Sequence, residues 1–179
     1  MQQRLRDLLK IVQVKTQISE FKVWKTIKLG TGPQTVADLR WALEQHRINI
    51  DKLAGDMLGH HAFTMTGTEF EVDLVVVSVS ELGFIARVTR TQIYERTREL
   101  GLELCPADVG PLLRLQYKDQ PVNEIIRMGM EAIIGPNHWL YVFELSCDEG
   151  GLWLGGEYGI PDRYYNGDDR WVFVLPRKG

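Results

Sequence analysis

Apolar residues near the start of the chain recur at helical spacing. In residues 3–18, Leu5, Leu8, Leu9 and Val12 fall on one side of a helical turn, whereas Arg4, Lys10 and Gln13 fall elsewhere around it. This pattern predicts an amphipathic helix. We expect residues 1–20 to pack on the body of the protein or to serve as an oligomerisation arm.

Two further helices are predicted between residues 35 and 59. Thr35 and Asp38 have the spacing of a capping box, in which each side chain binds a free backbone N–H of the other residue. A helix should follow to about Arg47. The stretch "NIDKLAGDMLG", residues 49–59, indicates a second short helix with Gly59 as its stop. Together these two helices are expected to form a helical hairpin.

The mid-chain helix has the clearest start and stop. Thr89 and Gln92 repeat the capping-box spacing, apolar residues follow at helical intervals, and Gly101 supplies a C-terminal stop. We therefore predict a helix over residues 90–100.

Alternating patterns predict strands on either side of these helices. Residues 21–29, "FKVWKTIKL", carry apolar side chains mainly at every second position, as in a half-exposed strand. In "EVDLVVVSVSEL", residues 71–82, both faces are apolar in the middle, which is typical of an interior strand.

Beyond Pro106 and Pro111 the chain changes to short β-like runs separated by turn residues. These runs are "LLRLQY" (112–117), "EIIRMGMEAI" (124–133), "WLYVFELS" (139–146), "GLWLG" (151–155) and "RWVFVLP" (170–176). The second could also be helical, although Gly129 argues against it. Helices first and strands later predict an α+β fold, with helices packed on a mainly antiparallel sheet that ends in a meander. We expect one domain over residues 1–179.

The charge distribution and the hydropathy exclude several kinds of partner. The net charge is −3, and residues 135–179 hold seven acidic and four basic residues, which is the whole excess. Such a region would repel a phosphate backbone, so we expect no nucleic-acid partner. No apolar run approaches the ~20 residues that cross a bilayer, and basic residues interrupt the N-terminus where a signal peptide is apolar. A cytoplasmic protein without a membrane partner is expected.

No metal or cofactor motif is complete. Cys105 and Cys147 lack metal-site or disulfide spacing and should be reduced and packed. His60 and His61 are adjacent, and neighbours point in different directions, so a solvated pair is favoured over a metal site. "GTGPQT", residues 30–35, precedes a helix but lacks the Gly pattern and the lysine of nucleotide-binding loops. We predict no cofactor.

The best candidate site is the acidic aromatic segment near residues 153–171. Aromatic rings beside carboxylates suit a small cationic or polar ligand, or a basic partner. The tyrosines fall between the last two predicted strands, where burial in the core is harder. The candidate ligand-binding residues are Trp153, Glu157, Tyr158, Asp162, Tyr164, Tyr165 and Asp169.

Three functions remain open for this segment. A non-enzymatic binding or regulatory protein, forming a homo-oligomer, is favoured. A hydrolase would instead use paired carboxylates there, which must lie in unlike environments so that one stays protonated. A purely structural homo-oligomer would use the aromatic strands and residues 3–18 as its subunit contact. Doubled acidic residues beside Gly, such as Asp168 and Asp169, also have a plainer role in turns.

Three stretches carry a resemblance to a known family. They are "FKVWKTIKLGTG" (21–32), "ELGLELCPADVGPLLRLQYKDQP" (99–121) and "LWLGG" with "DDRWVFVLPRK" (152–156 and 168–178). The chain resembles a family of uncharacterised bacterial proteins, including ones carried as mobile integron gene cassettes. The resemblance covers about residues 21–178 and implies an adaptive bacterial cytosolic protein, often self-associating, with no established activity or catalytic residues.

Overall fold

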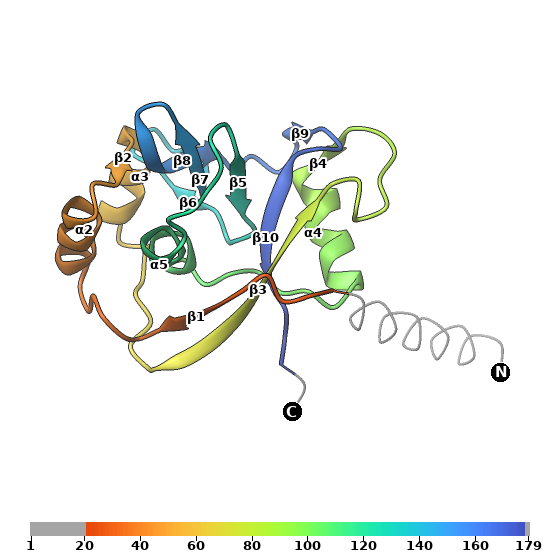
Figure 1. The fold of residues 1–179 in the computed structure, drawn as a ribbon. Coiled ribbons are helices and arrows are strands. Elements are labelled where there is room, and N and C mark those ends of the chain that lie inside the picture. Colours follow the sequence, from red (N-terminus) through yellow and green to blue (C-terminus); the bar gives the residue numbers. More distant parts are fainter. Residues whose placement is uncertain (1–20, 178–179) are drawn as a thin grey trace.

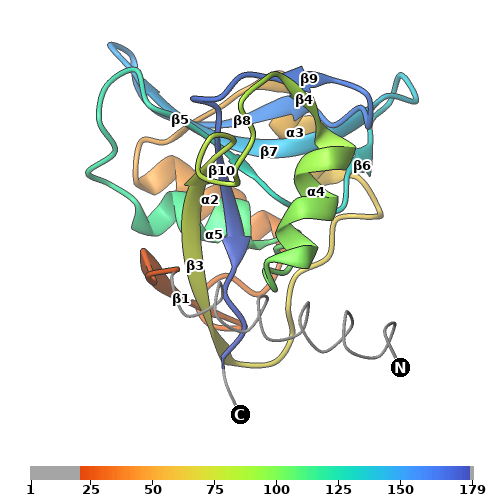
Figure 2. The same ribbon diagram turned by 90° about the vertical axis from the view of Figure 1, so that its right-hand side faces the viewer.

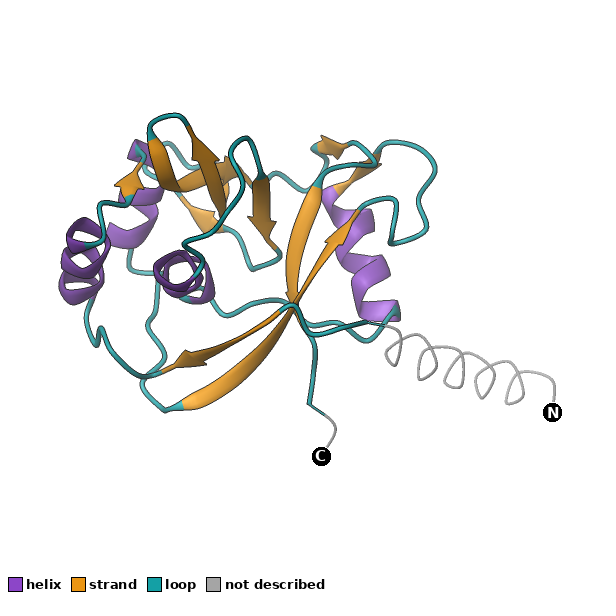
Figure 3. Cartoon of the chain, in the orientation of Figure 1, coloured by secondary structure: helices purple, strands orange, loops and turns teal. Residues whose placement is uncertain are grey.

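The computed structural model describes residues 21–177, so the predicted helix over residues 3–18 lies outside the described part. Within it the fold is α+β, with a curled, mostly antiparallel sheet in the order β1-β3-β10-β5-β7-β8-β2 (Figures 1 and 3). Its strands are β1 (Lys25–Leu29), β2 (Asn49–Ile50), β3 (Phe70–Ser78), β5 (Ile125–Met128), β7 (Leu140–Asp148), β8 (Gly151–Tyr158) and β10 (Arg170–Val174), with β6 (Ile133–Ile134) paired to β7. A small second sheet pairs β4 (Val88–Thr89) with β9 (Tyr164–Tyr165).

Helices lie on both faces of the large sheet. They are α2 (Val36–Gln45), α3 (Lys52–Gly59), α4 (Arg90–Glu99) and α5 (Val109–Gln116). Helix α4 covers one face of β3 and β10, where Tyr94 meets the rings of Trp171 and Phe173 edge-on at 5.9 and 6.0 Å. Figure 2 shows α4 in front of these strands, with α2 and α5 behind them. On that other face α5 packs on β7 and α3 packs on β8.

Both predicted capping boxes are confirmed. The Thr35 side chain accepts from the backbone N–H of Asp38, and the Asp38 carboxylate accepts from the backbone N–H of Thr35 at 3.0 Å. Thr89 and Gln92 make the same reciprocal pair at the start of α4. Gly101 follows α4 with φ at +78°, the left-handed conformation expected of a helix stop.

The interior strand is also confirmed. Strand β3 lies between β1 and β10, both antiparallel to it. Its central residues Leu74 and Val75 point to opposite faces and are both buried. The continuous apolar pattern therefore reflects helices or loops on both faces of the sheet.

The segment "LLRLQY" is helical, and its prediction as a strand was wrong. It forms most of α5, which begins just after Pro106 and Asp108 and carries Pro111 in its first turn, where proline costs no hydrogen bond. Gly110 lets α5 lie close to the sheet, because a Cβ atom there would be 2.9 Å from the Cβ of Phe143. Most of α5 is buried, and a short apolar run such as "LLRL" fits a buried strand as well as a buried helix.

Two predictions of topology need correction. Residues 49–50 are not part of the second predicted helix. They form β2, which pairs in parallel with Trp153 and Leu154 on β8. The C-terminal run is not a simple meander either. Strands β5, β7 and β8 are antiparallel neighbours, but β10 returns to lie between β3 and β5, parallel to β5. Strand order depends on such long-range pairing, which local alternation does not encode.

The two cysteines and the hydropathy of the helices are the last features of the described fold. Cys105 and Cys147 are unpaired and buried, as predicted. No helix between residues 21 and 177 is long and apolar enough to cross a membrane.

Candidate functional site

The candidate site lies on the polar face of β5, β7 and β8. Glu144 on β7 is registered between Gly155 on β8 and Arg127 on β5, so their side-chain positions share one face. Glu157 stands on this face two residues beyond Gly155. The opposite face, with Phe143 and its neighbours, packs into the core. The alternation of β7 thus separates a charged face from an apolar one.

Arg127 is the centre of the charged group. Its Nη1 donates to Asp169 Oδ1 at 2.9 Å, and its Nε lies 3.6 Å from a Glu157 oxygen and 3.9 Å from a Glu144 oxygen. Arg163 binds the other oxygen of Glu157 at 3.1 Å. The Arg127 side chain is only 12% exposed. Two guanidinium groups thus lie within 4 Å of three carboxylates: Glu144 on β7, Glu157 on β8 and Asp169 just before β10.

Glu144 is the least compensated of these carboxylates. The pKa of Glu144 is raised to about 7, chiefly by burial and to a smaller extent by the charges of Glu157 and Asp51, and the charge of Arg127 opposes this rise. The contact with Arg127 is too long for a hydrogen bond, and Arg127 is already bound by Asp169. Near neutral pH the Glu144 side chain is therefore either a carboxylate without a hydrogen-bonded cation or a protonated carboxyl.

Gly155 is buried where two carboxylates come close to the backbone of β8. A Cβ atom on Gly155 would lie 3.1 Å from Asp51 Oδ2 and 3.7 Å from Glu144 Oε1. Asp51 is the N-cap of α3, where Oδ1 accepts from the backbone of Ala54 and Oδ2 from the backbone of Gly156. Its carboxylate is thereby fixed at the edge of β8. Asp51 and Glu144 thus both pack against Gly155.

The structure brings together three of the seven predicted ligand-binding residues. Glu157 and Asp169 both contact Arg127, and Tyr165 packs beside them, with its ring centre 5.4 Å from the Arg127 guanidinium. Tyr165 is buried, contrary to the expectation of an exposed loop tyrosine, because β9 folds it against Trp171 at 4.9 Å. Burial raises the pKa of Tyr165 to about 12.

Of the other four predicted residues, Tyr158 contacts this group through Arg163, whose guanidinium lies 5.6 Å from the Tyr158 ring centre, and three lie apart from it. Trp153 is on the charged face of β8, and its Nε1 donates to Asp148 at 2.9 Å. Tyr158 lies on the opposite face, with its ring 5.3 Å from Trp139. Tyr164 is exposed under the Arg87 guanidinium, and Asp162 is exposed in a turn.

Four residues of the charged group escaped the sequence analysis: Asp51, Arg127, Glu144 and Arg163. Glu144 lies between two apolar residues of its strand, and a polar residue in such an alternation indicates the outer face of a sheet. Asp51 precedes a helix, which is a signal for a cap. Neither signal shows that distant segments meet.

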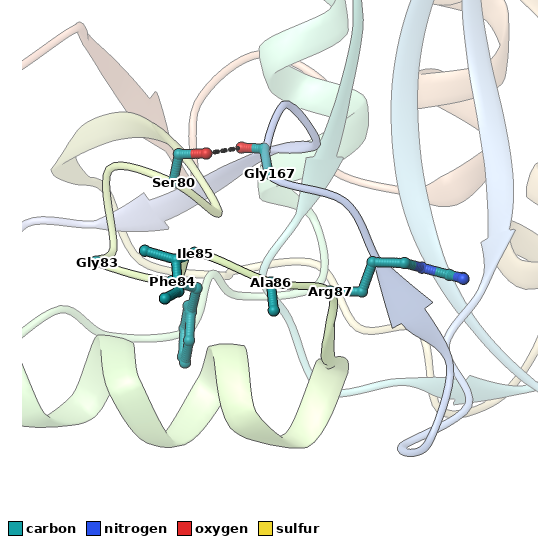
Figure 4. A pocket seen from close by; sticks show the side chains of 7 residues that line it. All are labelled: Ser80, Gly83, Phe84, Ile85, Ala86, Arg87 and Gly167. Atoms are coloured by element: carbon teal, nitrogen blue, oxygen red, sulfur yellow. Dashed lines mark hydrogen bonds between the residues drawn. The ribbon is translucent and has the colours of Figure 1, made fainter.

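Three cavities of the described part have other linings. One of about 640 Å³ is lined by the loop of residues 80–87 and by Gly167 (Figure 4). There Ser80 donates to the Gly167 carbonyl, Phe84 points toward α4, and Arg87 points away from the loop. Two others lie beside Arg40 and Arg47, and at the ends of β3 and β10. None of the three is lined by Glu144 or Glu157.

The arrangement suits electrostatic binding more than metal binding. In the part of the chain that the structure describes, no group of three or more His, Cys, Asp or Glu side chains could hold a metal ion. The rings of His60 and His61 lie 4.2 Å apart, tilted toward each other, and His60 Nδ1 accepts a hydrogen bond from the backbone N–H of Ala62.

Comparison with protein-family models, with curated proteins and with solved structures gives no match to this chain.

Proposed function

We propose that this protein binds a small organic cation, a primary ammonium or a guanidinium group, on the charged face of β7 and β8. The cation would lie against the partly exposed carboxylate of Glu144. The observation that carries the proposal is that Glu144, whose side chain is 20% exposed, approaches the nearest cation among the described residues, Arg127, only to 3.9 Å.

The charge of the surroundings supports this ligand class. Asp51, Glu144, Glu157 and Asp169 face Arg127 and Arg163, so one positive ligand would bring the group closer to neutrality. Glu144 lacks a short contact to a cation, and a bound cation would supply one. The half-buried Trp153 stands on the same face of β8, where its ring could pack against an aliphatic or cationic part of the ligand.

Calorimetric titration with agmatine and putrescine tests this proposal. The affinity should rise as the pH rises from 5.5 to 8, because Glu144 must lose its proton before it attracts a cation. Glu144→Gln should weaken binding about tenfold and remove the pH dependence. Glu149→Gln, a carboxylate in an exposed turn, is the matched control and should bind as the parent does. Absence of binding in the parent, or undiminished binding by Glu144→Gln, would refute the proposal.

A hydrolase is the second candidate, and one observation favours it. Glu144 has a pKa raised to about 7 and lies with Glu157 around the same Arg127 nitrogen, at 3.9 and 3.6 Å. One protonated and one ionised carboxyl is the arrangement of acid–base hydrolysis. Chromogenic glycosides test it, since turnover should disappear in both Glu144→Gln and Glu157→Gln. None of the three cavities described above is lined by Glu144, and enzymes enclose their substrates, so this candidate stands second.

A further inference from the structure

An apolar cavity opens at the ends of β3 and β10, far from the charged group in the fold. Its volume is about 320 Å³, and residues 103–106 close one side of it. Phe70, Leu104, Leu175 and Pro176 supply apolar surface, and the Phe70 side chain is 45% exposed. Apolar surface left open in this way commonly marks a contact with another segment or chain.

The rim of this cavity is acidic. Glu71, Asp73 and Glu103 line it, and the only basic residue among its lining residues is Arg177. Arg177 is already occupied, because it binds Glu71 at 3.0 Å and Asp73 at 2.8 Å. A segment that fits this surface should therefore be apolar on one side and basic beside it.

The first residues of the same chain have this composition. Residues 3–18 carry an apolar stripe of Leu5, Leu8, Leu9 and Val12, and four basic residues, Arg4, Arg6, Lys10 and Lys15, against one acidic residue, Asp7.

This segment is tethered to a strand that contacts the rim of the cavity. Thr26 on β1 donates a hydrogen bond to Asp73, a rim residue, at 2.6 Å. Residue 18 is three residues before Phe21, the first described residue, so it stays within about 10 Å of it. Tethering also raises the effective concentration of the segment near its own cavity above that of a segment from another copy.

We propose that residues 3–18 dock on the apolar cavity of their own chain, with the leucine stripe against Phe70, Leu104 and Leu175. The basic side chains then face Glu71, Asp73 and Glu103. This contact would bury the exposed apolar surface at the ends of β3 and β10 together with the apolar stripe of the segment. The proposal is independent of the proposed cation site.

Methyl NMR on the full chain tests it. With Leu and Val methyl groups labelled, NOE cross-peaks should join the methyls of Leu8 or Leu9 to those of Leu104 or Leu175. Leu8→Ser with Leu9→Ser should shift the Leu104 and Leu175 methyl signals, whereas Gln13→Ser, on the polar side of the stripe, should leave them in place. Circular dichroism checks that the variants keep the fold.

A mixture of labelled and unlabelled protein shows whether residues 3–18 dock on their own molecule or on another copy. Cross-peaks within one molecule, unchanged on dilution, are the expected result. Cross-peaks only between molecules would overturn the proposal in favour of a contact between copies, and light scattering would then show an oligomer. The absence of any cross-peak between residues 3–18 and the cavity would overturn it as well.

Discussion

Glu144 on β7 lies directly opposite Gly155 on β8, with its Oε1 atom 3.7 Å from the position of a Cβ atom on Gly155. A side chain at 155 would therefore crowd both Glu144 and Asp51. The glycine lets these two carboxylates pack against the same point of β8.

Gly155→Ala should reduce binding of agmatine about tenfold while leaving the fold intact. The added methyl would lie 3.1 Å from Asp51 Oδ2 and 3.4 Å from Glu144 Cγ, so these side chains must move apart. We expect the free energy of unfolding to change by less than about 1 kcal/mol. Calorimetry and urea denaturation measure the two effects. Gly67→Ala, with open space around it, should change neither quantity; equal losses of binding in both variants would contradict the assignment.

The stability of the protein should fall as the pH rises through the range of Glu144. Its folded-state pKa of about 7 lies above the unfolded value of about 4.3, so between these values the folded protein holds a proton that the unfolded chain releases. Stabilisation by that proton is complete at low pH and lost as the pH passes about 7. Glu144→Gln should therefore be more stable than the parent by about 2 kcal/mol at pH 8, with the gain much smaller at pH 5. Urea unfolding at both pH values measures the difference, and a gain that does not depend on pH would argue against a raised pKa.

Arg127→Met should destabilise the protein by about 3–5 kcal/mol, because it leaves Asp169, Glu157 and Glu144 without their shared buried cation. Thermal or urea unfolding measures the loss. Arg163→Met is the control, since the Arg163 side chain is 40% exposed and binds only Glu157 among the carboxylates of the group. Its cost should stay within about 1 kcal/mol. A similar cost for both variants would mean that Arg127 is not the centre of the group.

Gly156→Ala should test how closely α3 lies on β8. A Cβ atom there would be 2.6 Å from the Cβ of Leu53 and 3.1 Å from the backbone nitrogen of Ala54, so helix and strand must separate. We expect a loss of about 2–3 kcal/mol in the free energy of unfolding. Because Asp51 caps α3 and also binds the Gly156 N–H, agmatine binding should weaken too. Full stability of this variant would show that α3 is less closely packed than described.

The two thiols should be inert in the folded protein. Cys105 and Cys147 are buried, and burial raises the pKa of Cys105, so little reactive thiolate forms. A disulfide reagent such as DTNB should label neither thiol in the time that labels both in the urea-unfolded chain. Rapid labelling of the folded protein would place at least one thiol at the surface.

Local signals account for the elements that were predicted correctly. Thr35, Thr89 and Gly101 act on backbone groups within a few residues, so the starts and stops of α2 and α4 can be read from the sequence. The alternation in β7 and β8 likewise reflects one buried face. Helix α5 was missed because its apolar run is short, and the length and composition of such a run also fit a strand.

The charged group contains some of the residues that the sequence suggested and several that it did not. The excess of negative charge after residue 135 pointed to Glu157 and Asp169, which do lie in the charged group. Arg127, Asp51 and Glu144 joined it only through strand pairing, and Tyr165 left the surface because β9 holds it against Trp171.

The sequence by itself determined the α+β class, most helix ends, the interior position of β3 and the acidic character of the C-terminal quarter, since each depends on neighbouring residues or on composition. Only the tertiary structure decided that β10 lies between β3 and β5, that residues 49–50 join the sheet, and that Glu144 and Asp51 meet over Gly155. Those features depend on contacts between segments far apart in the chain, whose free energy comes from burial and pairing across the whole sheet and leaves no local pattern.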